Sequence, residues 1–224
     1  MATFALLHGA WHDPSCWDRV TEALEVRGHT VTAPELPLHD PAATYEDRVR
    51  PVLDALDGAE EPPVVVGHSQ SSSLAALVAA ARPVSLVVHL CPRMGTFELP
   101  DSAPRAFREG FPMPPAQPDG TVVWPPETAI EVMYPRLPPE TAHELAAHLR
   151  PMGMPPDDYP LREHPEVATA LIYAANDEFF EPEFERFVAH EVLGIDPIEV
   201  AGGHFAMAED PRALAELLYR LVAG

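Results

Sequence analysis

The 224-residue chain is predicted to form an α/β fold, with a mostly parallel, doubly wound sheet and helices on both faces. Short, near-continuous runs of apolar and β-branched residues recur along the chain, which is typical of strands buried on both faces. Segments with apolar residues at helical spacing separate most of these runs, and this alternation places consecutive strands parallel. The length fits one well-buried core, so we expect a single domain over residues 1–224.

The first expected elements alternate between strand and helix. Thr3 to Leu7 forms an apolar strand, and Pro14 to Val26 has the apolar spacing of a helix that Gly28 closes. Thr30 to Ala33 is the second strand. Tyr45 to Leu56 follows as an amphipathic helix.

The next strand, Val64 to Val66, leads into the segment that carries the predicted chemistry. Leu74 to Ala81 is rich in Ala and Leu and favours a helix, with Gly67-His68-Ser69-Gln70-Ser71 in between. A serine between a buried strand and a helix N-terminus is typical of a nucleophile elbow, where a strained turn exposes the hydroxyl. The elbow pattern has Gly two residues after the serine, and Ser71 stands there instead. Taken alone, this segment fits an ordinary turn serine equally well.

Three further strands and a closing helix complete the expected fold. The strands are Ser85 to Leu90, Thr169 to Ala174 and Asp196 to Val200. The helix is Pro211 to Val222, with proline in its first turn.

Residues 92–165 interrupt the alternation. This segment is dense in proline, and we expect short helices at Pro126 to Met133 and Pro139 to Leu149 but no strand of the main sheet. A connection this long within a compact domain is usually functional. We therefore expect residues 92–165 to form a lid over the strand ends, inserted within the single domain.

Composition excludes several classes of function. A formal net charge of −21 argues against nucleic acid and anionic membranes as partners, and acidic segments such as Glu181 to Glu185 are expected on a solvated face. Because no run of about 18 apolar residues occurs, no membrane span is expected. The chain also lacks the Gly-rich signatures of dinucleotide-binding and phosphate-binding loops.

The N-terminus and the cysteines favour a cytoplasmic protein. Residues 1–8 lack the basic start of a signal peptide. Cys16 and Cys91 are the only cysteines and lie far apart in the sequence, which fits reduced, buried thiols. The oligomeric state is left open, with a homodimer among the options.

Three side chains at strand ends predict nucleophilic catalysis. Ligands of parallel sheets bind beyond the carboxyl ends of the strands, and Ser69, Asp177 and His204 each follow a predicted strand. A serine nucleophile needs a base, and the base needs a third group that fixes its tautomer. The order Ser, Asp, His along the chain is that of α/β-hydrolases. Glu178 remains an alternative to Asp177, since predicted strand ends are uncertain by a residue or two.

Two backbone N–H groups are candidates for an oxyanion hole. In this arrangement one comes from the residue after the nucleophile and the other from the loop after the first strand. Gln70 is the first candidate, and Ala10 in His8-Gly9-Ala10 is the second.

The segments His8-Gly9-Ala10-Trp11-His12, Arg27 to Leu36 and Gly203 to Met207 resemble the α/β-hydrolase superfamily, closest to its methylesterase and hydroxynitrile-lyase branch. The resemblance implies a triad of Ser69, Asp177 and His204 and an oxyanion hole at Ala10 and Gln70. Cyanohydrin-cleaving members typically carry Thr after the first histidine and Lys after the catalytic one. This chain has Gly9 and Phe205 there, which is similar to the esterase members and implies an acyl-enzyme on Ser69.

The predicted function is hydrolysis of a carboxylic ester, thioester or lactone of a small to medium hydrophobic substrate, with no metal or organic cofactor. Trp11, Trp124 and Met133 are candidate substrate contacts, although lid residues of these types also fit the core of the lid itself. One alternative is a lyase, cyclase or eliminating enzyme of a biosynthetic pathway on the same scaffold, because a fold does not settle a reaction. The other alternative is a ligand-binding protein with a vestigial triad.

Overall fold

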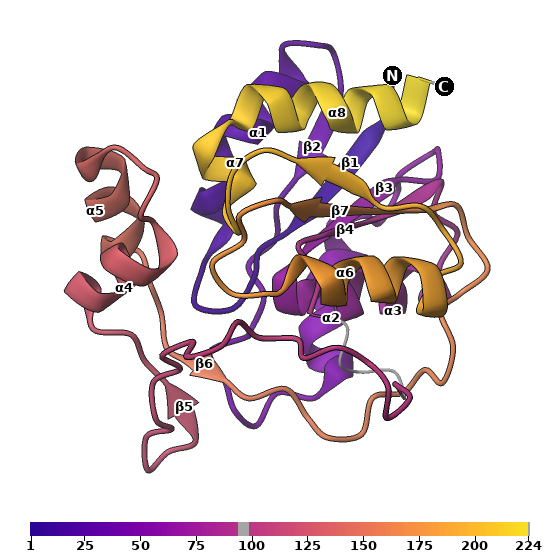
Figure 1. The fold of residues 1–224 in the computed structure, drawn as a ribbon. Coiled ribbons are helices and arrows are strands. Elements are labelled where there is room, and N and C mark those ends of the chain that lie inside the picture. The colour runs from indigo at the N-terminus through magenta and orange to yellow at the C-terminus, as the bar shows by residue number, and fades with distance from the viewer. Residues whose placement is uncertain (94–98, 224) are drawn as a thin grey trace.

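A parallel six-stranded sheet organises the chain (Figure 1), in a computed structural model that describes residues 1–93 and 99–223. The strand order is β2-β1-β3-β4-β7-β8, and every pairing is parallel, as the alternation of elements predicts. The strands are β1 (Thr3–Leu7), β2 (Thr30–Thr32), β3 (Val64–His68), β4 (Leu86–Leu90), β7 (Thr169–Ala174) and β8 (Ile198–Val200).

Helices cover both faces of this sheet (Figure 1). One face carries α1 (Asp18–Glu25), α7 (Ala206–Glu209) and α8 (Pro211–Ala223). The other face carries α2 (Tyr45–Ala55), α3 (Ser72–Ala81) and α6 (Pro182–Phe187). Shorter helical turns are η1 (Pro14–Trp17), η2 (Ser69–Ser71) and the π-helical η3 (Val188–Val192). The sequence did not predict α6, η3 or α7, which are too short to show a helical period.

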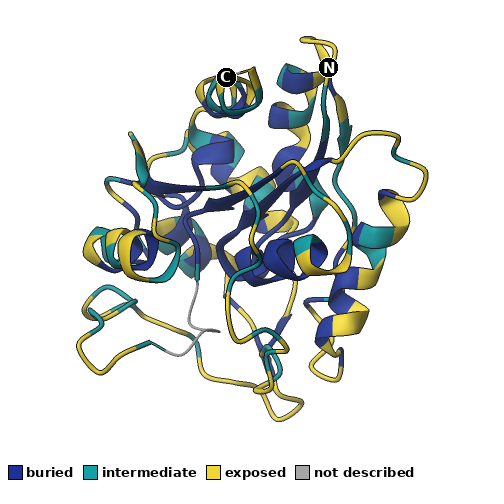
Figure 2. Cartoon of the chain, turned by 90° about the vertical axis from the view of Figure 1, so that its right-hand side faces the viewer, coloured by how far each residue is buried: buried dark blue, intermediate teal, exposed yellow. Residues whose placement is uncertain are grey.

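Apolar side chains of alternate strand positions fill a core on each side of the sheet. Figure 2 shows that most strand residues of the main sheet are buried. In β1, Phe4 and Leu6 belong to the cluster under α1 and α8, whereas Ala5 and Leu7 belong to the cluster under α2 and α3. All residues of β3 and β4 are buried. The polar groups at the ends of these two strands are therefore held by a rigid, dry layer.

The segment expected as a lid contains α4 (Pro126–Met133), as predicted, and α5 (Pro139–Ala147), two residues shorter than predicted. It also contains β5 (Thr121–Val122) and β6 (Met152–Gly153), an antiparallel pair too short for a sequence signal. Both helices lie beyond the carboxyl ends of the main strands (Figure 1). Residues 94–98 of this segment lie outside the described residues. A single domain with a lid at 92–165 remains a prediction.

The expectation of a solvated face at Glu181 to Glu185 is wrong at its last residue. Glu183 is exposed, but Glu185 is fully buried. Helix α6 packs against β7 and turns Phe184 and Glu185 inward together. Across residues 1–93 and 99–223, no helix combines the length and the apolar character needed to cross a membrane.

Candidate active site

Ser69 occupies a strained turn between β3 and α3. Its φ is +52°, a region that residues with a Cβ rarely adopt. Gly67 makes this turn close-packed, because a Cβ there would lie 2.5 Å from the carbonyl oxygen of Ser71. The structure therefore has the tight, strained geometry that the sequence predicts for an elbow.

Backbone strain gathers at neighbouring strand ends. Within the described residues, the only non-glycine residues with positive φ are Trp11 at +63°, Ser69 at +52° and Cys91 at +44°. They follow β1, β3 and β4, which lie side by side in the sheet. Strain of this kind persists only where surrounding packing fixes the backbone, and it is concentrated at functional sites.

His204 and Asp177 form a buried pair. The Nδ1 of His204 lies 2.7 Å from Oδ2 of Asp177, and their side chains are 2% and 0% exposed. Because an ionised carboxylate only accepts, Nδ1 carries the proton and Nε2 is left as the basic nitrogen. The backbone N–H groups of Phe179 and Phe180 donate to the other carboxylate oxygen, at 2.7 and 2.8 Å. The Asp177 carboxylate is thus fixed in position on both oxygens.

Glu178, the alternative acid, makes different contacts. Its carboxylate accepts the backbone N–H of His204 at 2.9 Å and forms an ion pair with Arg136. It therefore holds the backbone of His204, whereas Asp177 bonds to the imidazole.

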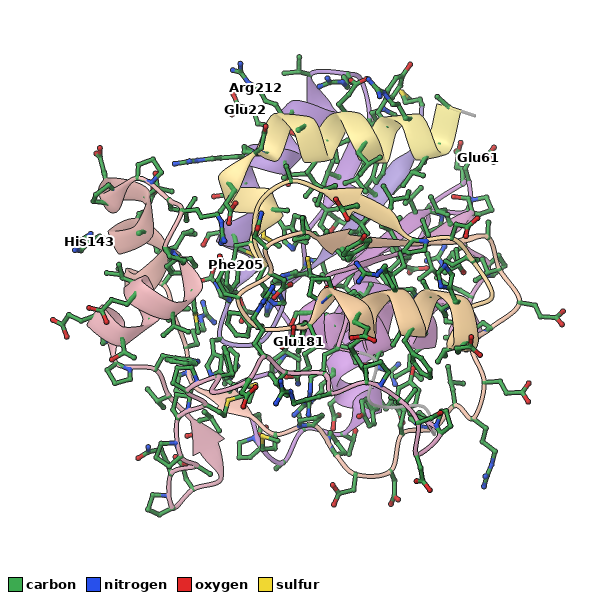
Figure 3. The ribbon with its side chains drawn as sticks, in the orientation of Figure 1. Glu22, Glu61, His143, Glu181, Phe205 and Arg212 are labelled. Atoms are coloured by element: carbon green, nitrogen blue, oxygen red, sulfur yellow. The ribbon has the colours of Figure 1, made fainter. Side chains whose placement is uncertain are left out.

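Aromatic rings enclose the imidazole of His204. Phe179 stacks on it with ring centroids 4.4 Å apart, and Phe205 meets it edge-on at 5.1 Å. Phe205 in turn contacts Tyr134, at the end of α4, and lies between the sheet and the helices α4 and α5 (Figure 3). The segment expected as a lid therefore supplies part of the apolar wall around this histidine.

His68 connects the elbow to the His204 loop. Its Nε2–H donates to the backbone carbonyl of His204 at 3.0 Å, and the two rings lie 4.7 Å apart. Burial lowers the pKa of His68 well below its ordinary value, so the ring is a neutral donor. Because Ser69 follows His68 directly, this bond places the backbone of the base candidate next to that of the nucleophile candidate.

Two side chains hold the loop after β1 that carries Ala10. The Ser71 hydroxyl donates to the carbonyl of His8 at 2.5 Å. His12 donates from Nδ1 to the carbonyl of Ala10 at 2.8 Å, and its Nε2 accepts from the Tyr134 hydroxyl at 2.6 Å. Burial lowers the pKa of both His8 and His12 to about 4. The residue that breaks the elbow pattern, Ser71, thus ties the elbow to the candidate oxyanion loop.

A cavity of about 190 Å³ opens at these groups. Ala10, Ser69 and Gln70 line it together, so the structure brings the candidate nucleophile and both candidate oxyanion donors to one place. Its walls are mainly apolar and include Trp11, Phe107, Val122, Met152 and Phe179.

Of the three predicted substrate contacts, only Trp11 lines this cavity. Trp124 and Met133 are buried in the adjoining core, where Trp124 meets Trp11 edge-on at 5.9 Å. Phe179 and Arg93 also line the cavity, although the sequence did not predict either as a site residue. Arg93 lies three residues after β4. Its position just after a strand end was the one feature of the sequence that could have predicted it as a site residue.

One group of potential metal ligands occurs among the described residues. The donor atoms of Cys91, Asp177 and His204 lie within 4.8 Å of one another. Asp177 and His204 already bond to each other, and burial raises the pKa of Cys91 well above its ordinary value. Because Nδ1 of His204 carries the proton that it donates to Asp177, this nitrogen has no free electron pair for a metal, and the group does not fit a metal well.

Comparison with known proteins identifies the family. Residues 4–217 match the model of the alpha/beta hydrolase family. The chain is 28% identical over 256 residues to a probable esterase of Oryza sativa subsp. indica, covering 98% of this chain and 96% of the relative. It is 25% identical over 252 residues to norfluorocurarine synthase 1 of Strychnos nux-vomica, covering 97% and 94%. The crystal structure of a methylesterase from Arabidopsis superposes with a TM-score of 0.77 at 21% identity, covering 100% and 99%.

These matches agree with the parallel sheet and with the expected order of strands and helices. The chain therefore belongs to the alpha/beta hydrolase family and is similar to esterases of its methylesterase-like branch.

Proposed function

We propose that the chain hydrolyses a carboxylic ester, thioester or lactone with Ser69 as nucleophile, His204 as base and Asp177 as the group that orients the base. The observation that carries this proposal is the buried hydrogen bond of 2.7 Å between His204 and Asp177. The backbone carbonyl of the same histidine accepts from His68, which directly precedes the strained Ser69.

The mechanism follows from the chemistry of these groups. His204 Nε2 takes the proton of the Ser69 hydroxyl as its oxygen attacks the ester carbonyl carbon. The N–H groups of Ala10 and Gln70 stabilise the negative oxygen of the tetrahedral intermediate. The imidazolium then protonates the leaving alcohol, and an acyl-enzyme remains on Ser69. Water loses its proton to the same nitrogen, attacks the acyl carbon and releases the acid.

The cavity favours a small to medium hydrophobic substrate. Its volume is about 190 Å³, and aromatic, Val and Met side chains form most of its wall. Dry apolar walls also strengthen the electrostatic interactions at the carbonyl. No metal or organic cofactor takes part in the proposed steps.

Labelling with a fluorophosphonate tests the nucleophile. We expect one covalent adduct on Ser69, located by peptide mass spectrometry, and none on the Ser69→Ala variant. Wild-type enzyme should also hydrolyse p-nitrophenyl esters, with an optimum at a short to medium acyl chain. An adduct on another serine, or none, would contradict the assignment.

A non-hydrolytic reaction on the same scaffold is the second candidate, because one full-length relative is named a synthase. An adduct on Ser69 without turnover of any ester would favour it. A ligand-binding protein with a vestigial triad would give neither adduct nor turnover. A cytoplasmic location and the absence of nucleic-acid partners stay predictions, and a homodimer stays an open option.

A further inference from the structure

Arg93 is a cation beside the candidate nucleophile. Its backbone N–H donates to the carbonyl of Ser69 at 3.1 Å, and it lines the same cavity as Ser69. Within residues 1–93 and 99–223, no carboxylate forms an ion pair with it, although Asp and Glu outnumber Lys and Arg by 35 to 14. Burial lowers the pKa of Arg93, but a guanidinium remains charged at neutral pH.

A second, more polar cavity adjoins the first at this residue. Its volume is about 210 Å³, and it shares Gln70, Arg93 and Met154 with the cavity of Ser69. The Tyr45 hydroxyl, also on its wall, donates to the carbonyl of Pro156 at 3.2 Å. Asp157 is the one acidic residue among the described residues of this wall, and its side chain is exposed and unpaired with Arg93.

Gln70 lines both cavities and carries a second, unpartnered donor next to the junction. Its side-chain Nε2 is buried and has no hydrogen-bond partner among the described residues. Buried donors without partners cost about 1–3 kcal/mol, more when they are charged. A carboxylate placed between the two cavities would accept from the guanidinium of Arg93, and a rotation of the Gln70 side chain would bring its unpartnered amide to the same carboxylate.

We propose that Arg93, with the Gln70 side-chain amide, binds a carboxylate of the substrate, so that the enzyme favours esters carrying a second, ionised carboxyl group. The scissile carbonyl lies at Ser69 in the apolar cavity, and the carboxylate lies at the junction with the polar cavity. Arginine suits this role because its planar fork of donors matches a carboxylate. The inference rests on the proposed function, and it narrows the substrate class to half-esters and acylated hydroxy acids.

Matched substrate pairs test this inference. Methyl hydrogen succinate, glutarate and adipate are compared with methyl butyrate, pentanoate and hexanoate, in which a methyl group replaces the carboxylate. O-Acetylated hydroxy acids, compared with acetate esters of the matching alcohols, place the charge on the leaving group instead. We expect kcat/KM to favour the charged member in at least one series.

Arg93→Met should lower kcat/KM for the favoured charged ester by about 10- to 100-fold, mostly through KM, because a charged hydrogen bond to bound substrate is lost. The ratio of kcat/KM for the charged ester to kcat/KM for its neutral partner should fall by a similar factor, because only the charged ester loses a charged hydrogen bond. Arg93→Lys should recover part of the loss. Arg19→Met is the control, because this exposed arginine pairs with Glu144 at 3.5 Å outside the cavity.

The outcomes separate this inference from the proposed function. Suppose that neutral esters are turned over and that this turnover depends on Ser69. No preference for the charged esters in either series, or no effect of Arg93→Met, would then overturn the carboxylate site without contradicting the proposed hydrolase. If no ester is turned over, calorimetry on Ser69→Ala still measures binding of the charged esters. Binding that Arg93→Met abolishes in that background supports the site, and equal binding with and without Arg93 overturns it. If Arg93→Met does not fold, Arg93→Lys and competition of wild type by free dicarboxylates replace it.

Discussion

At the scale of single residues, two adjacent acids hold one histidine in different ways. Asp177 bonds to the imidazole of His204 at 2.7 Å, whereas Glu178 bonds to its backbone N–H at 2.9 Å. Neighbours in the sequence point to different groups because the chain turns directly after β7. The division of roles can be tested by changing each acid alone.

Asp177→Asn should lower kcat by about 10⁴-fold, since the amide no longer holds the proton of His204 on Nδ1. Glu178→Gln is the matched control, because its amide oxygen still accepts the backbone N–H. We expect Glu178→Gln to keep kcat within about tenfold of wild type. Steady-state kinetics on a p-nitrophenyl ester measures both. The opposite pattern would transfer the role of Asp177 to Glu178.

Ser71 positions the candidate oxyanion loop through its bond to the His8 carbonyl. Ser71→Ala should lower the free energy of unfolding by about 1–2 kcal/mol, because a buried acceptor loses its donor, and should lower kcat as well. Ser72→Ala is the control, since the Ser72 hydroxyl bonds to Gly67 at 2.9 Å within the elbow and not to the loop. Urea unfolding should show similar losses of stability in Ser71→Ala and Ser72→Ala. Ester kinetics should show the larger loss of kcat in Ser71→Ala. Equal kcat values would mean that Ser71 is only structural.

At the scale of elements, helix α6 carries a buried acid behind the site. Both carboxylate oxygens of Glu185 lack a hydrogen-bond partner among the described residues. Burial and the nearby Asp177 raise the pKa of Glu185 well above its ordinary value. A group whose pKa is raised on folding destabilises the folded state at a pH where the unfolded chain is ionised.

Glu185→Gln should therefore raise the free energy of unfolding at pH 7 by roughly 1–3 kcal/mol. The gain should vanish below about pH 4.5, where the carboxyl group is protonated in both states. Glu183→Gln is the control, because this exposed residue on the same helix should change stability little at either pH. A gain that persists at pH 4 would show that ionisation of Glu185 is not its cause.

At the scale of the whole molecule, burial of histidines couples stability to pH. Burial lowers the pKa of His8 and His12 to about 4 and that of His89 to about 3. As the pH decreases, the unfolded chain binds protons at these residues from about pH 6.5, whereas the folded chain binds them only near pH 4 or below. Proton binding therefore stabilises the unfolded chain relative to the folded chain. The stability they contribute is therefore complete above pH 6.5 and is lost as the pH falls towards 4.

We expect the free energy of unfolding to fall by about 2 kcal/mol for each of these histidines between pH 7 and pH 5. Urea unfolding at half-unit steps of pH measures the slope. His89→Gln should reduce the slope by the share of one histidine, because His89 is buried and its ring bonds to His164 rather than to Asp177 or His204. If His89→Gln leaves the slope unchanged, protonation of His89 does not contribute to the pH dependence of stability.

Most elements of the main sheet could be predicted from the sequence. The limits of β1 and β7 match the prediction, and each of the other four strands differs from it by one or two residues at one end. Each is a short apolar run between breakers, so local sequence is sufficient. The two-residue strands β5 and β6 could not be predicted, because their pairing depends on contacts between residues about 30 positions apart.

The sequence by itself determined the parallel sheet, the elbow around Ser69 and the order of Ser69, Asp177 and His204, because these depend on local patterns and on strand ends that meet at one edge. Only the tertiary structure decided that Asp177 rather than Glu178 bonds to the imidazole of His204, and that Ser71 bonds to the His8 loop. It also decided that Trp11 lines the cavity while Trp124 and Met133 lie in the core, and that Arg93 lines it without an ion pair to any carboxylate of residues 1–93 and 99–223. The physical reason is that the direction of a side chain, and whether a charge finds a partner, are set by packing between distant segments.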